Sequence, residues 1–425
     1  MKCAVDEIAK DHNIIKNFGR IGLVINQTST SSSYISSAEI IYQAAKKTDH
    51  SKVTAVFGPQ HGYSQTEQDN MRETPDSEFQ FSDNTCVPLF SLYSKERAPT
   101  EQQLKNVDTL LVDLQDIGCR VYTYMLTLAG CLRSAAKYGK KVVVLDRENP
   151  LGLCYFNSVD KIWKRVEGNQ FQTEYHSFVG WYDIPIRHGL SMGELGYYFI
   201  QCDKLTLDYE VIKVTGLTRS ESLLFEKKCS WTMPSPNIPN YLSAFLFPAF
   251  VTLEGTNVSE GRGTTLPFQL IGSPWLKTKE CISFFHEYKK YFTPNLSEQD
   301  GIVFREHNFR PTFNKYKDEI CQGIQLHPQN LENINLFKFG LTFLVYCLLK
   351  QGDDFKWAKP GYEYNYTEAP INLILGSREL SDFFSQSPKI TNIKKGLEEF
   401  DHLMTKLDKE GQAFCEKAKN CFIYK

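Results

Sequence analysis

The feature that most constrains the fold is a regular alternation of short apolar runs and helix-like segments in the first half of the chain. The apolar runs have the length and the branched side chains of buried strands, and they lie at residues 21–25, 53–57, 88–92, 109–114, 142–145 and 209–214. Helical segments are expected at 36–47, from about 100, and at 123–138. Strands that alternate with helices pair in parallel through right-handed crossovers. The first half therefore predicts an α/β fold with a mostly parallel sheet.

Local signals indicate where several helices begin and end. Ser36 and Glu39 have the spacing of a capping box, in which each side chain bonds to the backbone N–H of the other residue. Ser191 and Glu194 have the same spacing, so we assign Glu194 a structural role at the start of a helix. Gly139 occupies the usual position just after a helix end.

The sequence changes in character near residue 230. Three prolines between positions 234 and 239 exclude regular structure there and suit a crossing between domains. The remainder mixes helical segments at 281–291, 336–349 and 394–419 with a strand candidate at 323–327. A chain of 425 residues is also too long for one compact core. We therefore expect two domains, residues 1–228 with the parallel sheet and residues 229–425 with a smaller α+β fold.

Polar side chains follow the last apolar residue of four predicted strands. These pairs are Asn26-Gln27, Gln60-His61, Gln115-Asp116 and Asp146-Arg147. Because the carboxyl ends of parallel strands meet at one edge, open α/β sheets bind their ligands there. The loop at 57–71 is the richest of these places, since it adds two carboxylates, Glu67 and Asp69, to the imidazole of His61. A solvated loop that caps the next helix would look the same in the sequence.

The composition excludes several classes of partner. The formal net charge is −2 and no run of Lys and Arg is interleaved with aromatic residues, so we expect no nucleic acid. No stretch approaches the roughly 18–20 apolar residues that span a bilayer, so we expect no membrane insertion. No glycine-rich phosphate loop follows a strand, which disfavours nucleotides. The N-terminus lacks the apolar segment of a secretory signal and the 12 cysteines are scattered singly, so we expect a cytoplasmic protein.

Several longer motifs follow one another in a characteristic order. They are FGPQHG at 57–62, QDNM at 68–71, LLVDLQDIGCRVYTY at 110–124, VVLDRENP at 143–150, IPIRHGLSMGEL at 184–195, PSPNIP at 234–239, LEGTNVSEGRGTTLPF at 253–268, GSPW at 272–275, RPTFNKY at 310–316 and GYEYNY at 361–366. In this order they resemble the NamZ family, exo-acting β-N-acetylmuramidases of peptidoglycan turnover that were long known as a domain of unknown function. The resemblance covers nearly the whole chain, and EGTNVSEGRGT is its most specific part.

The resemblance implies a Rossmann-like N-terminal domain, a smaller C-terminal domain and an active-site cleft between them. The implied reaction is the hydrolytic release of N-acetylmuramic acid from the non-reducing ends of peptidoglycan fragments. The implied partner is a sugar or muropeptide substrate, with no metal and no organic cofactor.

Two features depart from the family pattern. Many relatives carry Glu-His-Gly where this chain has Gln60-His61-Gly62. If that glutamate is the family's acid, this chain needs another acid or is inactive on the family substrate. Many members are also exported, whereas this chain shows no signal and is expected to process muropeptides, or a related substrate, inside the cell.

Glycoside hydrolysis usually needs one group to protonate the leaving oxygen and another to activate water or attack the anomeric carbon. We predict Glu67 as the acid/base, Asp69 as an orienting or second carboxylate, and His61 as a positioning group or proton carrier. Surface charges at a helix start would explain the two acids equally well, and a hydrogen-bonded structural histidine would explain His61. A route assisted by the sugar's own acetamido group would need one protein carboxylate. Retaining, inverting and substrate-assisted mechanisms therefore remain open.

The lactyl carboxylate of muramic acid suits a planar guanidinium, which can hold it through two parallel hydrogen bonds. Four arginines are candidates for this contact: Arg120, Arg147, Arg187 and Arg262. The other predicted substrate-binding residues are Gln60, Asp116, Asp146, His188, Asn237, Glu254, Asn257 and Glu260. An intramolecular ion pair is an equal alternative for Asp116 with Arg120, and the same ambiguity applies to Asp146 and Arg147. The Tyr-Glu-Tyr segment at 362–364 is expected on the rim of the cleft.

Two other functions fit the same sequence. One is a hydrolase or transferase that acts on another amino sugar. The other is a non-catalytic sugar-binding protein derived from an enzyme, for which Gln60 is the main argument.

Overall fold

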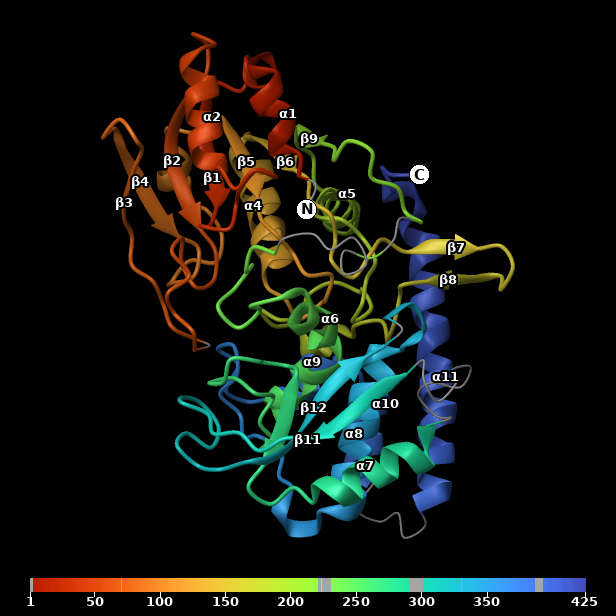
Figure 1. Ribbon diagram of the computed structural model, residues 1–425. Coiled ribbons are helices and arrows are strands. Elements are labelled where there is room, and N and C mark those ends of the chain that lie inside the picture. Colours follow the sequence, from red (N-terminus) through yellow and green to blue (C-terminus); the bar gives the residue numbers. More distant parts are fainter. Residues whose placement is uncertain are drawn as a thin grey trace.

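The computed structural model describes residues 3–69, 71–220, 223, 231–289, 301–329, 331–386 and 393–425. These residues form two lobes, one above the other in Figure 1. The upper lobe is built around a mostly parallel sheet and the lower lobe around a smaller antiparallel sheet. The expected Rossmann-like α/β domain followed by a smaller α+β domain is confirmed.

The sheet of the first lobe has seven strands in the order β3-β4-β2-β1-β5-β6-β9. The bounds are β1 Arg20–Ile25, β2 Lys52–Gly58, β3 Ser77–Gln80, β4 Cys86–Ser91, β5 Thr109–Asp113, β6 Lys141–Leu145 and β9 Tyr209–Ile212. Neighbouring strands pair in parallel except β3 and β4, which pair antiparallel at one edge. The chain builds outwards from β1 through β2 and β4 on one side and through β5, β6 and β9 on the other. The strand order therefore reverses beside β1, where such sheets place a ligand.

Different helices bury the two faces of this sheet. The helices of the first lobe are α1 Val5–Lys10, α2 Ser37–Lys46, α3 Glu101–Leu104, α4 Tyr124–Tyr138 and α5 Met192–Asp203. Successive residues of a strand point to opposite faces, so Leu23 of β1 packs in the cluster with α1 and α2, whereas Val24 packs in the cluster with α4 and α5. A strand that is buried on both faces needs a nearly continuous apolar run, which is the pattern that predicted β1, β5 and β6.

Two of the expected helix boundaries are confirmed. At the start of α5, Glu194 N donates to Ser191 Oγ at 3.2 Å and Ser191 N donates to Glu194 Oε2 at 3.2 Å, which completes the capping box. At the end of α4, Gly139 adopts φ 63°, a left-handed conformation that glycine reaches without strain.

The capping box expected at Ser36 and Glu39 is wrong. Ser36 makes no side-chain hydrogen bond at the start of α2. Glu39 instead accepts hydrogen bonds from Ser82 Oγ at 2.5 Å and Gln43 Nε2 at 2.8 Å. Ser82 lies in the turn between β3 and β4, so a contact that is distant in sequence takes the carboxylate away from the helix start.

The second lobe combines a three-stranded antiparallel sheet with helices. The sheet has the order β10-β12-β11, with β10 Leu270–Ser273, β11 Ile302–Glu306 and β12 Gln322–Pro328. The helices are α6 Tyr241–Phe250, α7 Thr278–Glu287, α8 Leu336–Lys350, α9 Pro370–Leu375, α10 Arg378–Gln386 and α11 Ile393–Ala418. The helix expected at 281–291 begins earlier than predicted, and residues 290 and 291 lie outside the described residues. Among the helices that the structure describes, none is long and apolar enough to cross a membrane.

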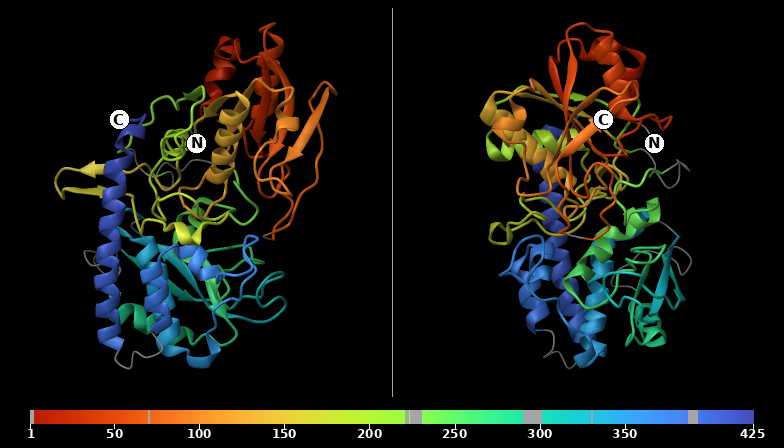
Figure 2. Two further views of the ribbon diagram at one scale, coloured as in Figure 1. Left: turned by 180° about the vertical axis from the view of Figure 1, so that it is seen from behind. Right: turned by 90° about the vertical axis from the view of Figure 1, so that its left-hand side faces the viewer.

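The long helix α11 connects the two lobes. It runs along one side of the molecule from the bottom of the second lobe up to the hairpin of β7 (Tyr155–Asn157) and β8 (Ile162–Lys164), as Figures 1 and 2 show. Gln412 of α11 bonds through its side chain to both backbone groups of Trp163 in β8. Beyond the helix, the Tyr424 hydroxyl donates to Asp146 Oδ2 at 2.7 Å. The C-terminal residues therefore pack on the first lobe.

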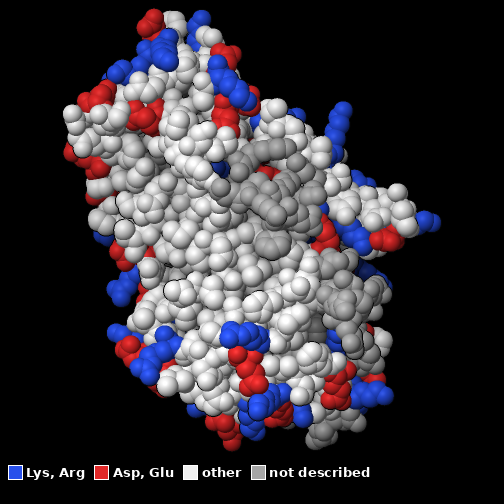
Figure 3. Space-filling model, in the orientation of Figure 1, with Lys and Arg blue, Asp and Glu red and all other residues white. Residues whose placement is uncertain are grey.

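Charged residues of both signs are mixed on the face shown in Figure 3. Lys and Arg lie among Asp and Glu at the two ends of the molecule, and the middle of this face is mostly uncharged. The visible face therefore offers no broad basic surface of the kind that binds nucleic acid.

Candidate active site

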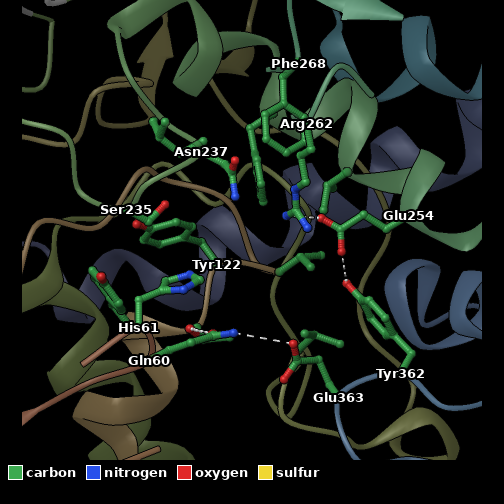
Figure 4. A pocket seen from close by; sticks show the side chains of 17 residues that line it. Gln60, His61, Tyr122, Ser235, Asn237, Glu254, Arg262, Phe268, Tyr362 and Glu363 are labelled. Atoms are coloured by element: carbon green, nitrogen blue, oxygen red, sulfur yellow. Dashed lines mark hydrogen bonds and ion pairs between the residues drawn. The ribbon is translucent and has the colours of Figure 1, made fainter. Parts of the chain in front are cut away.

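A cavity lies between the two lobes and is lined by 17 residues. The first lobe contributes residues 60–61, which follow β2, and residues 121–124, which follow β5 and lead into α4. Because β1 lies between β2 and β5, the cavity sits at the reversal of strand order. The second lobe closes it with residues from the proline-rich crossing, from α6 and from the loops that follow. Figure 4 shows this arrangement.

Gln60 is held by hydrogen bonds at both ends of its amide. Thr123 Oγ1 donates to Gln60 Oε1 at 2.5 Å. Gln60 Nε2 donates to the Tyr93 hydroxyl oxygen at 3.1 Å and to Glu363 Oε1 at 3.5 Å. The amide is thus fixed with its N–H groups towards Glu363, and it joins the first lobe to the second.

Glu363 is the most perturbed carboxyl group in the cavity. It is 5% exposed, and burial raises its pKa to about 6, with the nearby charge of Glu254 adding to the rise. The Tyr93 hydroxyl donates to Glu363 Oε2 at 2.8 Å and opposes that rise. A carboxyl group with a raised pKa in a cleft is a candidate proton donor.

Several non-glycine residues in and beside the cavity have left-handed backbones, among them Phe268 with φ 63°. His61 has φ 70°, Glu363 has φ 45° and Tyr364 has φ 65°. Such conformations cost of order 1 kcal/mol or more for residues with a Cβ and collect at functional sites, where surrounding contacts hold them. Both His61 and Glu363 are therefore held in place by the loops that carry them.

His61 has one ring nitrogen engaged by the protein. Nδ1 lies 2.7 Å from the carbonyl oxygen of Glu67, so Nδ1 carries the proton and donates to that oxygen. Burial lowers the pKa of His61 to about 4, and the charge of Arg262 adds to the effect. The ring is therefore neutral above this pH, and Nε2 has a lone pair that can accept a proton.

Glu254, Arg262 and Tyr362 form a bonded group on the opposite wall. Arg262 Nη2 donates to Glu254 Oε1 at 2.6 Å, and the Tyr362 hydroxyl donates to Glu254 Oε2 at 2.7 Å. Behind them, Glu260 Oε2 accepts from Lys315 Nζ at 2.9 Å. Arg262 Nε is buried without a hydrogen bond, although it lies 3.7 Å from Glu260 Oε1. The guanidinium therefore lies between the carboxylates of Glu254 and Glu260.

Aromatic rings line much of the remaining wall. The ring of Tyr122 lies edge-on to those of Tyr124 and Phe247, with ring centres 4.9 Å and 6.0 Å apart. The ring of Phe247 lies edge-on to that of Phe268, with ring centres 4.8 Å apart. All four rings line the cavity. Rings with apolar faces and polar neighbours suit a sugar, which has apolar C–H faces and hydroxyl groups at its edge.

Five of the residues predicted from the sequence line this cavity: Gln60, His61, Asn237, Glu254 and Arg262. Asn237 Nδ2 donates to the carbonyl oxygen of Gln68 at 2.8 Å, which fixes the amide in the wall. The structure adds Glu363, which the sequence placed only in a segment on the rim, and Tyr93, which the sequence did not single out. The run GYEY was the one signal for Glu363, and nothing in it indicated a buried carboxyl group.

The side chains of Glu67 and Asp69 do not line the cavity. Glu67 contributes its backbone carbonyl, which holds the ring of His61, while its partly exposed side chain lies elsewhere. The charge of Asp69 acts on Arg262, so it lies near the edge of the site. The prediction that Glu67 faces the substrate rested on closeness in sequence to His61, and Glu67 is not among the residues that line the cavity.

Three of the four arginines proposed for the lactyl carboxylate are used inside the protein. Arg120 is fully buried and donates to the carbonyl oxygens of residues 169, 184, 374 and 375. Arg147 forms an ion pair with Asp113 at 2.5 Å, and Arg187 forms one with Glu167 at 2.6 Å. The structure therefore leaves Arg262 as the candidate that faces the cavity.

The remaining predicted residues make local structural bonds outside the cavity. Asp116 Oδ2 accepts from Gly118 N at 2.6 Å and lies 3.5 Å from His188 Nε2, so it does not pair with Arg120. Asp146 accepts from Ser191 Oγ at 2.6 Å and from Gly193 N at 3.0 Å, which ties β6 to the start of α5.

Asn257 and Glu260 lie in the glycine-rich run but behind the cavity wall. Asn257 Nδ2 donates to the carbonyl oxygen of Asp354 at 2.8 Å. Glu260 is 1% exposed and binds Lys315, so it supports Arg262 from behind. Neither side chain reaches a ligand in the cavity.

Among the residues that the structure describes, no group of three or more His, Cys, Asp or Glu side chains is arranged to hold a metal ion.

Two family models match the chain, one on each side of residue 243. The model described as exo-β-N-acetylmuramidase NamZ, N-terminal, matches residues 21–242, and the model described as exo-β-N-acetylmuramidase NamZ, C-terminal, matches residues 245–424. A relative from Bacillus subtilis (strain 168), the peptidoglycan β-N-acetylmuramidase NamZ, is 34% identical over 361 residues. The match covers 85% of this chain and 80% of that relative.

Two crystal structures of DUF1343 family proteins from Bacteroides fragilis have a similar fold. One has a TM-score of 0.79 and 26% sequence identity, and the other has a TM-score of 0.66 and 24% identity. Each comparison covers 100% of this chain and 99% of the other chain. The similarity therefore extends over both lobes.

Proposed function

The chain belongs to the NamZ family of exo-β-N-acetylmuramidases, and we propose that the cavity between its lobes releases N-acetylmuramic acid from the non-reducing ends of peptidoglycan fragments. The B. subtilis relative is described as a peptidoglycan β-N-acetylmuramidase. One observation carries the proposal: Glu363, a buried carboxyl group with a raised pKa, and His61, a neutral imidazole, line the same cavity. A glycosidase needs one group that gives a proton and one that takes a proton.

Glu363 is the proton donor in this proposal. Its pKa of about 6 keeps roughly a tenth of the carboxyl groups protonated at pH 7 and most of them protonated below pH 6. Tyr93 and Gln60 hold the two oxygens of the carboxyl group from one side, which leaves its direction fixed. Glu363 gives its proton to the glycosidic oxygen as the bond between that oxygen and the anomeric carbon breaks.

His61 is the proton acceptor. Its Nε2 takes a proton from the water molecule whose oxygen forms the new bond to the anomeric carbon. The muramic acid then carries the hydroxyl group from water, and the leaving sugar carries the proton from Glu363. Exchange with solvent afterwards returns a proton to Glu363 and removes one from His61. In Figure 4 the two side chains lie on either side of Gln60.

Arg262 is the proposed partner of the lactyl carboxylate. It is the one candidate arginine in the cavity wall. Its ion pair with Glu254 fixes the plane of the guanidinium. A fixed planar donor recognises a carboxylate with directional hydrogen bonds.

The amide at position 60 does not imply a loss of activity, because in this proposal Glu363 of the second lobe supplies the acid. Where many family members carry glutamate, this chain has an amide whose N–H points at Glu363 Oε1. The buried acid is therefore retained in the cavity, and it comes from a different part of the chain.

The test is the hydrolysis of a chromogenic N-acetylmuramide by the wild type, Glu363→Gln and Glu67→Gln. We expect Glu363→Gln to lower kcat by about 10² or more, the usual scale for loss of a general acid. We expect Glu67→Gln to keep kcat within a few-fold of the wild type, because its side chain does not line the cavity. Glu319→Gln, at an exposed position of the second lobe, is the matched control. A large loss at Glu67 with full activity at Glu363 would reverse the assignment.

The same assay separates the two rival functions. A chromogenic N-acetylglucosaminide as a parallel substrate would reveal a hydrolase of another amino sugar. Tight binding of N-acetylmuramic acid without turnover of either glycoside would identify a non-catalytic sugar-binding protein.

We also infer a role inside the cell, in the turnover of muropeptides. Eleven cysteines are described and all are free thiols, which a reducing compartment favours. We keep the division into residues 1–228 and 229–425 as a proposal, supported by the proline-rich crossing that follows it. Limited proteolysis followed by mass spectrometry would locate the crossing.

A further inference from the structure

Arg97 lies beside the proposed acid, and within the described part of the chain its guanidinium forms no ion pair and contacts only aromatic rings. Its Cζ lies 4.1 Å from the ring centre of Tyr93, 4.3 Å from that of Tyr364 and 5.2 Å from that of Phe178. These three rings form an aromatic cage around the guanidinium. The loop that carries Arg97 is packed tightly on α4, because a Cβ added at Gly130 would meet the Arg97 carbonyl oxygen at 3.0 Å.

Within the described residues, Arg97 differs from Arg120, Arg147 and Arg187 because its guanidinium contacts aromatic rings and no carboxylate or carbonyl oxygen. Its Nη1 is buried and has no hydrogen-bond partner within the described part of the chain. Arg147 and Arg187 each bind a carboxylate, and Arg120 binds four backbone carbonyls. Cation–π contacts contribute roughly 0.5–2 kcal/mol each, which can hold the guanidinium without neutralising its charge.

The cage of Arg97 and the support of Glu363 share the same residues. Tyr93 offers its ring to Arg97 and its hydroxyl to Glu363 Oε2 at 2.8 Å. Tyr364 follows Glu363 directly in the chain, and its ring lies 6.1 Å from that of Tyr93. Arg97 and Glu363 are therefore held on two sides of one tyrosine.

We propose that Arg97 is a positioning residue, whose charge, free of any carboxylate of its own, acts through the shared tyrosines to govern how readily Glu363 holds its proton. The inference rests on the proposed function only in naming Glu363 as the acid. The groups that act on Glu363 are Gln60, Tyr93, Glu254, Tyr362 and Arg97.

These groups act in opposite directions. Burial and the charge of Glu254 favour the protonated carboxyl group, whereas the hydrogen bonds from Tyr93 and Gln60 and the charge of Arg97 favour the carboxylate. Arg97 is the one cation among them. Without it, Glu363 should keep its proton to a higher pH, and the enzyme should stay active to a higher pH.

The experiment compares the pH dependence of kcat on a chromogenic N-acetylmuramide for the wild type, Arg97→Met and Arg97→Lys. Methionine keeps most of the apolar stem and removes the charge, while lysine keeps the charge. In Arg97→Met we expect the pH at which kcat falls on the alkaline side to be higher by about 0.5–1 pH unit. This is the scale of the effect of one charge across several ångströms of protein. Arg97→Lys should restore the wild-type limb, and Arg378→Met at the surface should not move it.

A second measurement makes the result independent of turnover. The free energy of unfolding of Glu363→Gln, relative to its parent, reports the proton affinity of Glu363 in the folded protein. This difference is measured against pH in the wild-type background and again in the Arg97→Met and Arg97→Gln backgrounds. Without the arginine, the pH at which the difference changes should move upwards by about the same 0.5–1 pH unit. Identical curves in all backgrounds would overturn the inference. If the wild type hydrolyses no muramide, the proposed function fails, and the unfolding curves still decide the role of Arg97.

Discussion

Replacing the proposed acid Glu363 by glutamine should stabilise the protein at neutral pH while it removes activity. The pKa of Glu363 is raised from 4.5 to about 6 by burial, and the residue is 5% exposed, so the shift needs little discount for solvent. Below pH 4.5 the carboxyl group is protonated in both the folded and the unfolded chain, and its ionisation costs nothing. Between pH 4.5 and 6 the unfolded chain loses its proton first. Above pH 6 the folded chain therefore carries a cost of about 2 kcal/mol, from 1.5 pH units at about 1.36 kcal/mol each.

Glutamine mimics the protonated carboxyl group and does not ionise. The difference in unfolding free energy between Glu363→Gln and the wild type should therefore rise by about 2 kcal/mol as the pH increases from 4.5 to 6 and then stay level. Urea unfolding at half-unit steps from pH 4 to 8, followed by circular dichroism, measures it. The control Glu319→Gln, at an exposed site, should give a flat difference. A flat difference for Glu363→Gln, or one that falls with pH, would refute the view that burial holds this carboxyl group protonated.

Three further outcomes follow from the same geometry. Because His61 must be neutral and Glu363 protonated, kcat/KM should be bell-shaped with its maximum between pH 4 and 6; a profile that rises to pH 8 would exclude this pair. Arg262→Lys keeps the charge beside Glu254 but loses the planar fork, so it should raise KM for the muramide about tenfold more than for the glucosaminide, and equal effects would exclude the lactyl contact. Gln60→Glu places a second carboxyl group about 3.5 Å from Glu363, so the pKa of one of the two groups should rise by at least about 1 pH unit. Carbon NMR of labelled glutamate can detect this rise, and an unchanged titration would show that the two groups do not share a proton.

The sequence predicted the first lobe well because its strands are buried on both faces. β1, β5 and β6 give continuous apolar runs, and the parallel order follows from the helices between them. The pattern failed where structure depends on distant contacts. α6 is apolar on all sides and contains Pro248, so it has no helical period to detect. The short strands β7 and β8 have three residues each, which is too few for an alternation to stand out.

The site was predictable only where a local signal marks it. Gln60 and His61 follow the end of β2, and that position together with the motif FGPQHG identified them. Glu363 is 303 residues away from Gln60 in the chain and lies in a loop without a regular element. The role proposed for Glu363 depends on its burial and on its hydrogen bond from Tyr93, and neither can be seen in GYEY. The sequence could not choose among the arginines for the same reason. Arg120 looks like a ligand-binding residue until its four carbonyl partners are known.

Gln60 and Glu363 are best understood as one unit. Two carboxyl groups at their separation would repel when both are ionised, and one of them would hold its proton strongly. An amide at position 60 removes that repulsion and supplies an N–H donor to Glu363 Oε1 instead. Glu363 can then titrate near pH 6 rather than higher, with Tyr93 and Arg97 restraining it further. An amide at position 60 is therefore consistent with an active enzyme, provided that Tyr93 and Gln60 keep their hydrogen bonds to Glu363.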